Sequence, residues 1–324
     1  MPRVDRRSAQ LAQDSGGHLM SATAATSPDQ PLLSVLIPFY RDDPSSLVRA
    51  LDAQSRTVAA AIEIVLCDDG SGDATLTTAL ENLKSELSTP LVLVTRPVNA
   101  GRAAARNVLA QAASGTWSLF LDADMTLPDG FLARWLNEIE TEDFDAAFGG
   151  FEAEPADTPD GRLHAAISAA SDIGGAEDRT RKGPTAFCTS NLLVRANIMP
   201  RVLFDEAFRG WGWEDVDWAV RAAQAGRLKH VDNPAGHRGW QSVEQLLARY
   251  RDAAANYALL LRKHPELAAL PGAKAARTLR AVPGQAVLRG VWQGLARSET
   301  VPMRVRTLAL KLWRASWAAE VIEQ

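Results

Sequence analysis

The sequence predicts an α/β fold, with a mostly parallel central sheet flanked by helices and a helical region at the C-terminal end. Three observations indicate this. Short apolar runs of strand length alternate with helical segments between residues 32 and 151. Most of these runs are apolar at all but one position, as is typical of strands that are covered on both faces. From Ser242 onward the pattern is helical to the end of the chain, so the sheet is expected to be complete before that residue.

Strands are predicted wherever an apolar run is followed by turn-forming or charged residues. The predicted strands and extended segments are residues 32–38, 62–67, 91–95, 117–121, 146–151, 185–195 and 227–231. Strands that alternate with helices favour right-handed βαβ units, and therefore a mainly parallel sheet.

Helices are predicted where apolar residues recur at helical spacing. They cover residues 44–54, 74–87, 102–113, 132–139 and 218–225. Asp73 is placed to cap the second of them, and Gly226 ends the last. The acidic, glycine-rich residues 152–182 are expected to form a mobile loop with one short helix at about 164–171. Four prolines interrupt the helical residues after Ser242, namely Pro265, Pro271, Pro283 and Pro302.

Composition places the chain among ordinary soluble globular proteins. Of 324 residues, 46% are hydrophobic and 23% are charged, and the net charge of -4 gives no reason to expect a nucleic-acid partner. Neither Cys67 nor Cys188 has metal-ligand spacing, so a reducing compartment is expected. No apolar run reaches the length of a membrane span, and the polar residues 1–30 are expected to be a disordered leader.

Polar clusters follow four of the predicted strands, at the point where each strand ends. They are residues 40–42, 68–71, 99–106 and 122–124. Ligands of open α/β sheets bind beyond the carboxyl ends of the strands, so these clusters are expected to share one site. Asp122 and Asp124 are the most informative pair, because two carboxylates beside a buried strand are costly without a positive partner. Such a pair can hold a divalent cation and, through it, phosphate oxygens, although a lone Asp-x-Asp more often caps a helix.

The ordered set of motifs resembles the family 2 glycosyltransferases with the GT-A fold. The motifs are Ser-Val-Leu-Ile-Pro-Phe-Tyr at 34–40, Asp-Asp-Gly-Ser at 68–71, Asn-x-Gly-x-x-x-Ala-Arg-Asn at 99–107, Asp-x-Asp at 122–124 and Gly-Trp-Gly-Trp-Glu-Asp at 210–215. The last motif also resembles the C-terminal part of galactosyltransferase-like and chondroitin-synthase-like enzymes. The resemblance covers residues 32–240, and the order of the motifs is more specific than any one of them. It implies a hexosyltransferase that uses a nucleotide-sugar donor.

The resemblance implies that the first four motifs bind the nucleotide sugar. Asp68 and Asp69 are expected to contact the base and the ribose, since carboxylates accept hydrogen bonds from N–H groups and hydroxyls; an Asp-Gly turn is the simpler alternative. Arg102 or Arg106 is expected to approach the diphosphate, and a solvated helix face is the alternative. The implied donor-binding residues are Pro38, Tyr40, Asp68, Asp69, Asn99, Gly101, Arg102, Arg106, Asp122 and Ala123.

A divalent cation, Mn²⁺ or Mg²⁺, is also implied by the resemblance. Its expected ligands are Asp124, His237 and Asp122, with Asp124 as the more direct ligand and a ribose contact as the alternative for Asp122. His230 is a nearby competitor of His237, but it lies within a predicted strand. Some relatives carry a further Asp where this chain has Met125, and this difference leaves the central pair in place.

The acidic residues of the last motif are expected to act on the acceptor. The resemblance implies that Asp215 is the general base that takes a proton from the acceptor hydroxyl, and that Glu214 helps to bind the acceptor. Helix-dipole complementation is the alternative for acids in a first helical turn. Trp211 and Trp213 offer flat apolar faces suited to sugar rings, or belong to the core.

The C-terminal helices are basic and rich in tryptophan. Residues 274–317 contain nine basic residues and one acid, Glu299. Basic, Trp-bearing amphipathic helices bind anionic membrane surfaces, whereas a helical hairpin packed on the catalytic domain is the alternative. Processive synthases of the family have membrane spans and a Gln-x-x-Arg-Trp motif. This chain has no predicted span and only a near match at 245–250, so a non-processive enzyme is expected.

The sequence therefore predicts an inverting, metal-dependent, non-processive glycosyltransferase. Its expected donor is a UDP-sugar, and its expected acceptor is a hydroxyl of a saccharide or a lipid-linked molecule. The expected location is the cytoplasm, with peripheral contact to the inner face of the membrane through residues 274–317. The expected domains are a leader at 1–30, a GT-A domain at 31–240 (nucleotide-sugar half 31–125, acceptor half 126–240) and a helical region at 241–324.

Two other classes of protein are alternatives. A nucleotidyltransferase would need a Gly-rich loop after the first strand, where this chain has Pro-Phe-Tyr-Arg-Asp-Asp at 38–43. A receiver-like module would use Asp68 and Asp69, but it gives no role to Glu214 and Asp215. The intact acids in all three clusters argue against a non-catalytic nucleotide-sugar-binding module.

Overall fold

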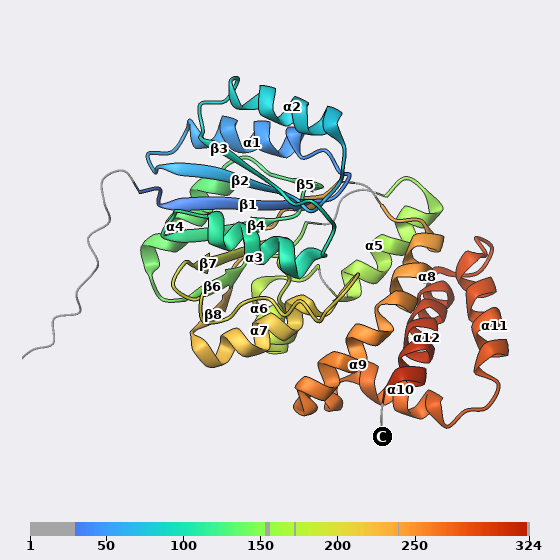
Figure 1. Ribbon diagram of the computed structural model, residues 1–324. Coiled ribbons are helices and arrows are strands. Elements are labelled where there is room, and N and C mark those ends of the chain that lie inside the picture. Colours follow the sequence, from blue (N-terminus) through green and yellow to red (C-terminus); the bar gives the residue numbers. More distant parts are fainter. Residues whose placement is uncertain (1–29, 153–155, 172, 239, 323–324) are drawn as a thin grey trace, which may run out of the picture. The chain divides into compact units, whose positions relative to one another are not determined.

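The computed structural model describes residues 30–152, 156–171, 173–238 and 240–322. Residues 31–324 form one compact unit (Figure 1). The predicted leader at 1–30 lies outside the described residues, except for Gln30.

A mostly parallel sheet of seven strands forms the centre of this unit. Its strands are β1 (Leu33–Phe39), β2 (Ile62–Asp68), β3 (Leu91–Thr95), β4 (Trp117–Leu121), β6 (Ala146–Phe148), β7 (Asn191–Arg195) and β8 (Leu228–His230). Their order across the sheet is β3-β2-β1-β4-β7-β6-β8. β7 runs antiparallel to both of its neighbours, and the other pairs are parallel. The predicted sheet is therefore confirmed.

Helices cover both faces of the sheet. One face is covered by α1 (Ser45–Ser55), α2 (Ala74–Lys84) and α4 (Phe131–Thr141). The other face is covered by α3 (Arg102–Ala112) and α7 (Glu214–Ala225). The predicted cap of α2 is present, because the Asp73 carboxylate accepts hydrogen bonds from the amides of Thr75 and Leu76.

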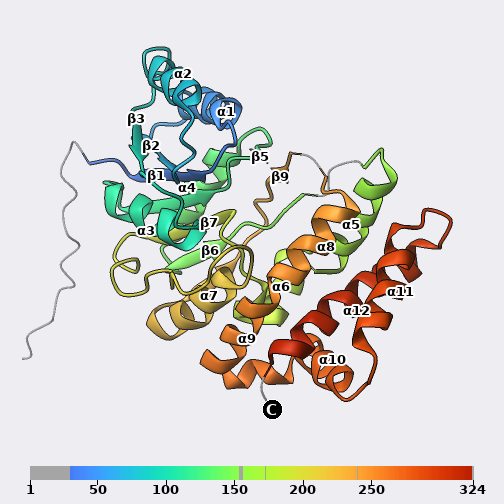
Figure 2. The same ribbon diagram turned by 45° about the vertical axis from the view of Figure 1, so that its right-hand side comes forward.

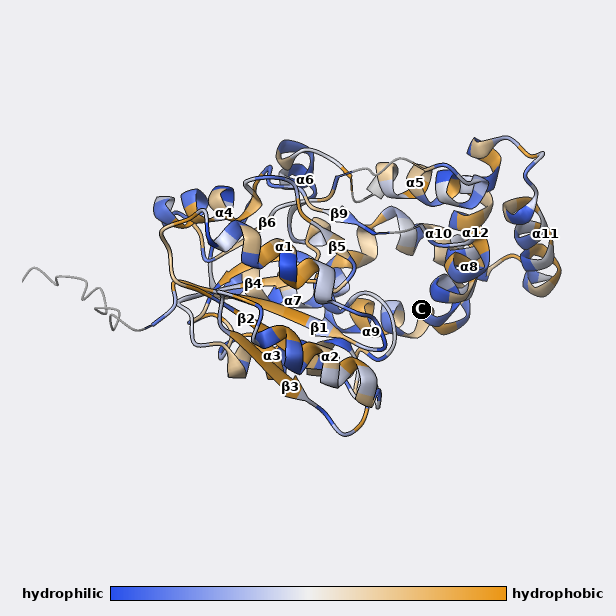
Figure 3. Cartoon of the chain, turned by 90° about the horizontal axis from the view of Figure 1, so that it is seen from above, coloured by the Kyte–Doolittle hydropathy of each residue, from blue (hydrophilic) through white to orange (hydrophobic). Residues whose placement is uncertain are grey.

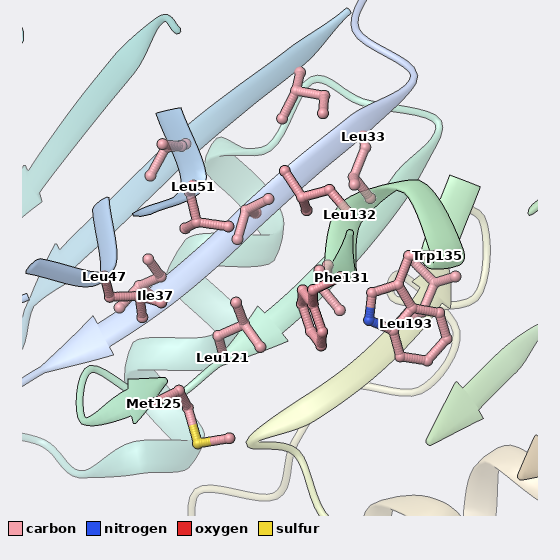
Figure 4. Close-up of a cluster of buried hydrophobic side chains, with 14 of the residues drawn as sticks. Leu33, Ile37, Leu47, Leu51, Leu121, Met125, Phe131, Leu132, Trp135 and Leu193 are labelled. Atoms are coloured by element: carbon pink, nitrogen blue, oxygen red, sulfur yellow. The ribbon is translucent and has the colours of Figure 1, made fainter. Parts of the chain in front are cut away.

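Alternation along β1 divides the core into two layers. Ile37 packs with the helices of the first face, as Figure 4 shows, whereas Leu36 belongs to the cluster on the second face. In Figure 3 the strands are the most hydrophobic part of the sheet region. Each fully buried Leu or Ile side chain contributes roughly 1.5–3 kcal/mol relative to exposure. The strand ends are therefore held in fixed relative positions, which matters for the polar residues that follow them.

The short helix predicted at about 164–171 is confirmed, but the loop predicted around it, within 152–182, is wrong because much of it is helical. α5 (Pro159–Ser171) and α6 (Ala176–Lys182) occupy it, and a 3₁₀ turn (Gly183–Ala186) follows. Leu163 and Ile167 are buried in a cluster with side chains of the C-terminal helices. The sequence around residues 152–182 does not reveal these distant partners, which is why the prediction failed. The turn also shortens the predicted extended segment at 185–195 to β7.

The C-terminal region consists of helices, and three of the four breaks between them contain the predicted prolines, whereas the break at Ala253 contains none. The helices are α8 (Val243–Asp252), α9 (Ala254–Lys263), α10 (Pro271–Arg280), α11 (Gln285–Arg297) and α12 (Met303–Val321). Figure 2 shows α5 lying beside α8. Among the described residues, no helix is both long enough and apolar enough to cross a membrane.

A buried ionic cluster ties α7 to α9. Asp217 is fully buried, and its carboxylate accepts hydrogen bonds from Arg221 (2.7 Å) and His264 (2.9 Å) and pairs with Lys263 (2.7 Å). Burial raises the pKa of Asp217, but the hydrogen bonds from Lys263, Arg221 and His264 more than offset this, and the pKa lies below its usual value. Asp217 therefore stabilises the junction between the sheet region and the C-terminal helices as a carboxylate.

Asp217→Asn is expected to lower the free energy of unfolding at pH 7 by about 3 kcal/mol, because it removes a fully buried carboxylate from its ion pairs with the partly buried Arg221 and Lys263. A lowered pKa contributes stability above the unfolded pKa of about 3.9, which is lost as the pH falls through the folded pKa. Urea unfolding at several pH values measures both effects. The matched control is Asp205→Asn, which removes a partly exposed partner of Lys263 and should cost much less. Equal losses for the two variants would contradict the role of Asp217.

Candidate active site

The candidate site lies at the carboxyl edge of three adjacent strands. β1 pairs with β2 on one side and with β4 on the other, so the chain leaves neighbouring strands in opposite directions. Such a switch point is where ligands of open α/β sheets bind. The ends of these strands and the segments that follow them carry Tyr40, Asp68, Asp69, Asp122 and Asp124.

Arg106 joins acids from two distant parts of the sequence. Its guanidinium donates to Asp122 Oδ1 (3.1 Å), Glu214 Oε1 (3.2 Å) and Asp215 Oδ1 (3.4 Å). Burial raises the pKa of Asp122, but Arg106 above all lowers it, and the result is about 2. Asp122 therefore remains a carboxylate at neutral pH. Binding of Arg106 to a diphosphate stays a prediction, and its contacts in the structure are with these three acids.

Asp215 is held at the first turn of α7. Thr189 Oγ1 donates to its Oδ1 (2.6 Å), and Cys188 Sγ lies 3.4 Å from its Oδ2. Burial raises the pKa of the Cys188 thiol well above its usual value, and Asp215 adds to this. The cysteine is thus a neutral neighbour of the carboxylate, which remains partly exposed at 20%.

Glu214 is less accessible than its neighbour. Only 3% of its side chain is exposed. Burial raises its pKa, and the charge of Asp215 raises it further. The expected contact of Glu214 with an acceptor stays a prediction. Of the two acids, Asp215 is the one whose carboxylate is open to solvent.

Asp124 and His237 meet across a second, two-stranded sheet. β5 (Met125–Thr126) pairs with β9 (Gly236–His237), and Met125 lies opposite His237. His237 Nδ1 is 3.4 Å from Asp124 Oδ1; Asp124 is exposed, whereas His237 is half-buried. Burial lowers the pKa of His237, but the hydrogen bond with Asp124 and its charge raise it more. Met125 is 1% exposed, so this position points into the core and away from the cation site.

These two donors fit a hard divalent cation. Mg²⁺-type sites use one or two carboxylates together with water and substrate phosphates, and imidazole suits several transition metals. Among the described residues, no group of three or more His, Cys, Asp and Glu side chains is arranged as a metal site. His230, the competitor, packs 4.4 Å from Phe187 by ring centroid and has a pKa of about 4 because of burial.

Asp68 and Asp69 are buried and brace the neighbouring loops. Asp69 accepts hydrogen bonds from the amides of Ala100 (3.2 Å) and Gly101 (2.8 Å), and it pairs with Arg96 (3.0 Å). Asp68 accepts from the Ser71 amide (2.8 Å). This bracing holds Asn99 and Gly101 at the start of α3. A base or ribose contact of either acid stays a prediction.

Gly70 is required where these two loops approach each other. Its φ is +78°, and a Cβ would lie 2.4 Å from the carbonyl carbon of Val98. Tyr40 is exposed on the β1 side, with the Arg41 guanidinium 5.0 Å from its ring centroid. Pro38 lies within β1, and Ala123 is buried beside the two acids.

Arg102 differs from Arg106 in its surroundings. It lies one turn earlier on α3, and within the described part of the chain it forms no hydrogen bond or ion pair. Its charge lowers the pKa of Asp122, after burial and Arg106. Arg102 therefore presents an uncommitted guanidinium beside Asp122.

The two tryptophans of the last motif face the C-terminal helices. The Trp213 ring stacks on Tyr257 of α9 at 4.4 Å, and the Arg314 guanidinium lies 4.6 Å from its centroid. Trp213 also has a φ of +78°, which is unusual for a residue with a side chain. Its ring is thus committed to packing, which favours the core alternative over acceptor binding. Trp211 contacts Tyr250 and Arg249.

Arg249 of α8 is a site residue that the motif comparison missed. Its guanidinium lies 5.8 Å from the Trp211 centroid, and it makes no hydrogen bond or ion pair with described residues. Burial and Arg102 lower its pKa, whereas Asp124, Asp122 and Asp42 raise it. Its position in the near match at 245–250 was the available signal. The register of that match differs by one residue from the processive motif, so sequence alone did not place Arg249 at this edge.

Comparison with known proteins identifies the family. The model of the glycosyl transferase family 2 matches residues 34–197, just over half of the chain. The chain belongs to this family. It is therefore a glycosyltransferase, and the predicted GT-A fold with a C-terminal helical region is confirmed. The match ends before the motif at 210–215, so the likeness of that motif to galactosyltransferases and chondroitin synthases stays a prediction.

Individual relatives of this glycosyltransferase are distant. The uncharacterized glycosyltransferase EpsJ of Bacillus subtilis is 29% identical over 127 residues, which is 39% of this chain and 36% of EpsJ. The chain thus aligns with about a third of the length of that relative. The mannosyltransferase PcManGT from Pyrobaculum calidifontis, solved with GDP-Man and Mn²⁺, has a TM-score of 0.53, 18% identity and coverage of 89% and 86%. Residues 1–349 of S. aureus TarS with UDP-GlcNAc have a TM-score of 0.51, 16% identity and coverage of 89% and 90%.

Proposed function

We infer that this enzyme is an inverting, non-processive glycosyltransferase that moves a sugar from a nucleotide sugar to an acceptor hydroxyl. The observation that carries this is the ion-pair cluster of Arg106, which unites Asp122 and Asp215 from opposite parts of the chain. A donor-side acid and an acceptor-side base must lie close together for a single displacement. Such a cluster at the ligand-binding edge of the sheet meets this requirement.

In the proposed reaction, Asp215 accepts the proton of the acceptor hydroxyl. The hydroxyl oxygen forms a bond to the anomeric carbon while the bond from that carbon to the diphosphate breaks. The nucleoside diphosphate leaves with the electron pair, and the configuration at the anomeric carbon inverts. The hydrogen bond from Thr189 holds the Asp215 carboxylate at a rigid helix start, as a general base requires.

Asp124 and His237 would hold Mn²⁺ or Mg²⁺. When bound, the cation would act as a Lewis acid that offsets charge on the diphosphate. Asp122 is engaged by Arg106 and by Ser190, whose hydroxyl donates to Oδ2 (3.0 Å). This favours a ribose contact over direct metal ligation for Asp122. Arg102 and Arg249 are proposed to face the diphosphate, because neither forms an ion pair with the described residues.

A UDP-sugar is the proposed donor, and the base can be tested directly. The solved neighbours are in complex with UDP-GlcNAc and with GDP-Man, so a panel of UDP- and GDP-sugars with and without Mn²⁺ is the appropriate screen. A true donor should stabilise the fold by mass action. Turnover should release a nucleoside diphosphate and give a product of inverted anomeric configuration by NMR. Release of pyrophosphate would instead indicate nucleotidyl transfer.

The acceptor is proposed to be a saccharide or a lipid-linked hydroxyl, with peripheral membrane contact through part of residues 274–317. Three of the basic residues in this range are not available to a membrane, because Arg289 and Arg306 are buried and Arg297 pairs with Glu244. Arg304 and Lys311 of α12 form no ion pair with described residues. They line a hollow of about 310 Å³ that also contains the exposed Leu308. Cations around an exposed apolar residue suit an anionic lipid surface.

Arg304→Gln/Lys311→Gln is expected to weaken binding to vesicles of phosphatidylcholine and phosphatidylglycerol by roughly tenfold or more, since each cation near an anionic surface contributes about 1 kcal/mol. Co-sedimentation with the vesicles measures it. The matched control is Arg49→Gln/Lys84→Gln on the sheet helices, which should bind like the wild type. Equal binding by all three proteins, or no binding by the wild type, would contradict membrane contact through this face.

A further inference from the structure

Arg106 contacts three acids of the site, and no other cation of the described residues contacts any of them. Within the described part of the chain, Asp122, Glu214 and Asp215 form ion pairs with no other residue. Arg106 Nη2 donates a hydrogen bond to Asp122, and Nη1 donates to Glu214 and Asp215. The side chain is 1% exposed, and Phe204 lies beneath the guanidinium at 5.7 Å. Its orientation is therefore fixed by packing as well as by charge.

Two hydroxyl groups form a second set of contacts with Asp122 and Asp215. Ser190 donates to Asp122 Oδ2 (3.0 Å), and Thr189 donates to Asp215 Oδ1 (2.6 Å). These hydroxyls are adjacent in sequence and immediately precede β7. Asp122 and Asp215 each accept one hydrogen bond from Arg106 and one from a hydroxyl of the residue pair before β7. We call this arrangement of four contacts the frame.

The shape of the arginine side chain matters in this frame. A guanidinium presents its N–H groups in a rigid planar fork, whereas the ammonium of lysine is a point charge on a flexible stem. A lysine at this position would keep the charge among the three acids. It would not keep the separate contacts that set Asp122 apart from Asp215.

We propose that Arg106 is a positioning residue that fixes Asp215 relative to Asp122 and does not itself bind the donor. This inference rests on the proposed function, in which Asp215 is the base and Asp122 lies on the donor side. It assigns different tasks to two arginines on the same face of α3. Arg102, which has no described ion-pair partner, binds the diphosphate, and Arg106 organises the acids.

The test compares Arg106→Lys with Arg102→Lys in the full-length protein. Calorimetry with UDP and Mn²⁺, and separately with GDP and Mn²⁺, measures nucleotide affinity; release of nucleoside diphosphate from the donor that the wild type uses measures kcat. For Arg106→Lys we expect Kd to change by less than about twofold and kcat to fall by about 100-fold, since a small misplacement of a catalytic group has an effect of this size. For Arg102→Lys we expect Kd to rise by about tenfold, because the bidentate contact with phosphate is lost.

Two further variants keep the inference testable. Thr189→Val removes one hydrogen bond to Asp215 without changing charge, and its effect on kcat should be smaller in the Arg106→Lys background than in the wild type. If Arg106→Lys does not fold, Arg106→Gln/Glu214→Gln preserves the net charge and is measured against Glu214→Gln alone. In that pair the added change at Arg106 should again lower kcat and leave Kd unchanged.

The outcomes separate this inference from the proposed function. A tenfold or greater loss of nucleotide affinity in Arg106→Lys, or an unchanged kcat, would overturn the positioning role while the reaction stands. A wild type that releases no nucleoside diphosphate from any sugar of the panel would overturn the proposed function. The affinity comparison with UDP and GDP would still decide whether Arg106 binds the donor.

Discussion

Asp215→Asn is expected to lower the rate of sugar transfer by about 1,000-fold, which is within the range for loss of a general base. Asn has the same shape as Asp and can still accept the hydrogen bond from Thr189, but it cannot take a proton from the acceptor. Because Asp215 is proposed to act on the acceptor and not on the donor, donor affinity should change little. Product formation at saturating donor and calorimetry with UDP and Mn²⁺ measure the two quantities.

The matched control for this prediction is Asp252→Asn. Asp252 lies at the end of α8 and forms an exposed ion pair with Arg251, and such a pair contributes little. The control should transfer sugar at the rate of the wild type. If Asp215→Asn retains more than about a tenth of the wild-type rate, the assignment of the base is wrong, since general-base catalysis contributes at least about 100-fold.

Asp124→Asn and His237→Ala are each expected to weaken Mn²⁺ binding in the presence of UDP by about 10- to 100-fold, as removal of groups that hold or orient a metal does. The two side chains are neighbours across the β5–β9 pair, and each variant removes one of the two donors. Electron paramagnetic resonance reports free Mn²⁺ directly, so this test does not depend on knowing the donor sugar. Both variants should also lose the Mn²⁺-dependent thermal stabilisation by UDP.

His230→Ala is the control for the metal prediction. His230 lies in β8 among Phe148 and Phe187, so its replacement should lower stability and leave Mn²⁺ affinity unchanged. Loss of Mn²⁺ affinity in His230→Ala, together with wild-type affinity in His237→Ala, would reverse the assignment of the histidine ligand.

The fold could be predicted from the sequence because its strands are short, mostly apolar runs that alternate with helical segments. The residues of β3 and β4 match the predicted ranges without a shift, and their apolar runs end in the polar residues that form the site. The proximity of Asp124 to His237 was also predicted, since the resemblance assigns both residues to one metal site, and the two side chains lie 3.4 Å apart. Long-range packing was not predictable in the same way. Leu163 and Ile167 form a helix whose partners lie more than 70 residues later in the chain.

The different surroundings of Arg102 and Arg106 could not be predicted from the sequence. In the sequence, Arg102 and Arg106 are equivalent basic residues one helical turn apart, and the motif gives no means of separating them. The structure buries Arg106 against three acids and leaves Arg102 without an ion-pair partner among the described residues. Trp213 shows the same limit, because the partners that occupy its ring, Tyr257 and Arg314, belong to helices beyond the recognised motifs.

The most direct measurement of the central claim is a crystal structure of the protein with UDP and Mn²⁺. We predict a nucleotide at the carboxyl edge of β1, β2 and β4, with the ion in contact with Asp124 and His237. We also predict that Asp215 is open to the space beyond the terminal phosphate. A nucleotide bound elsewhere on the protein, or an ion that contacts neither Asp124 nor His237, would contradict the central claim.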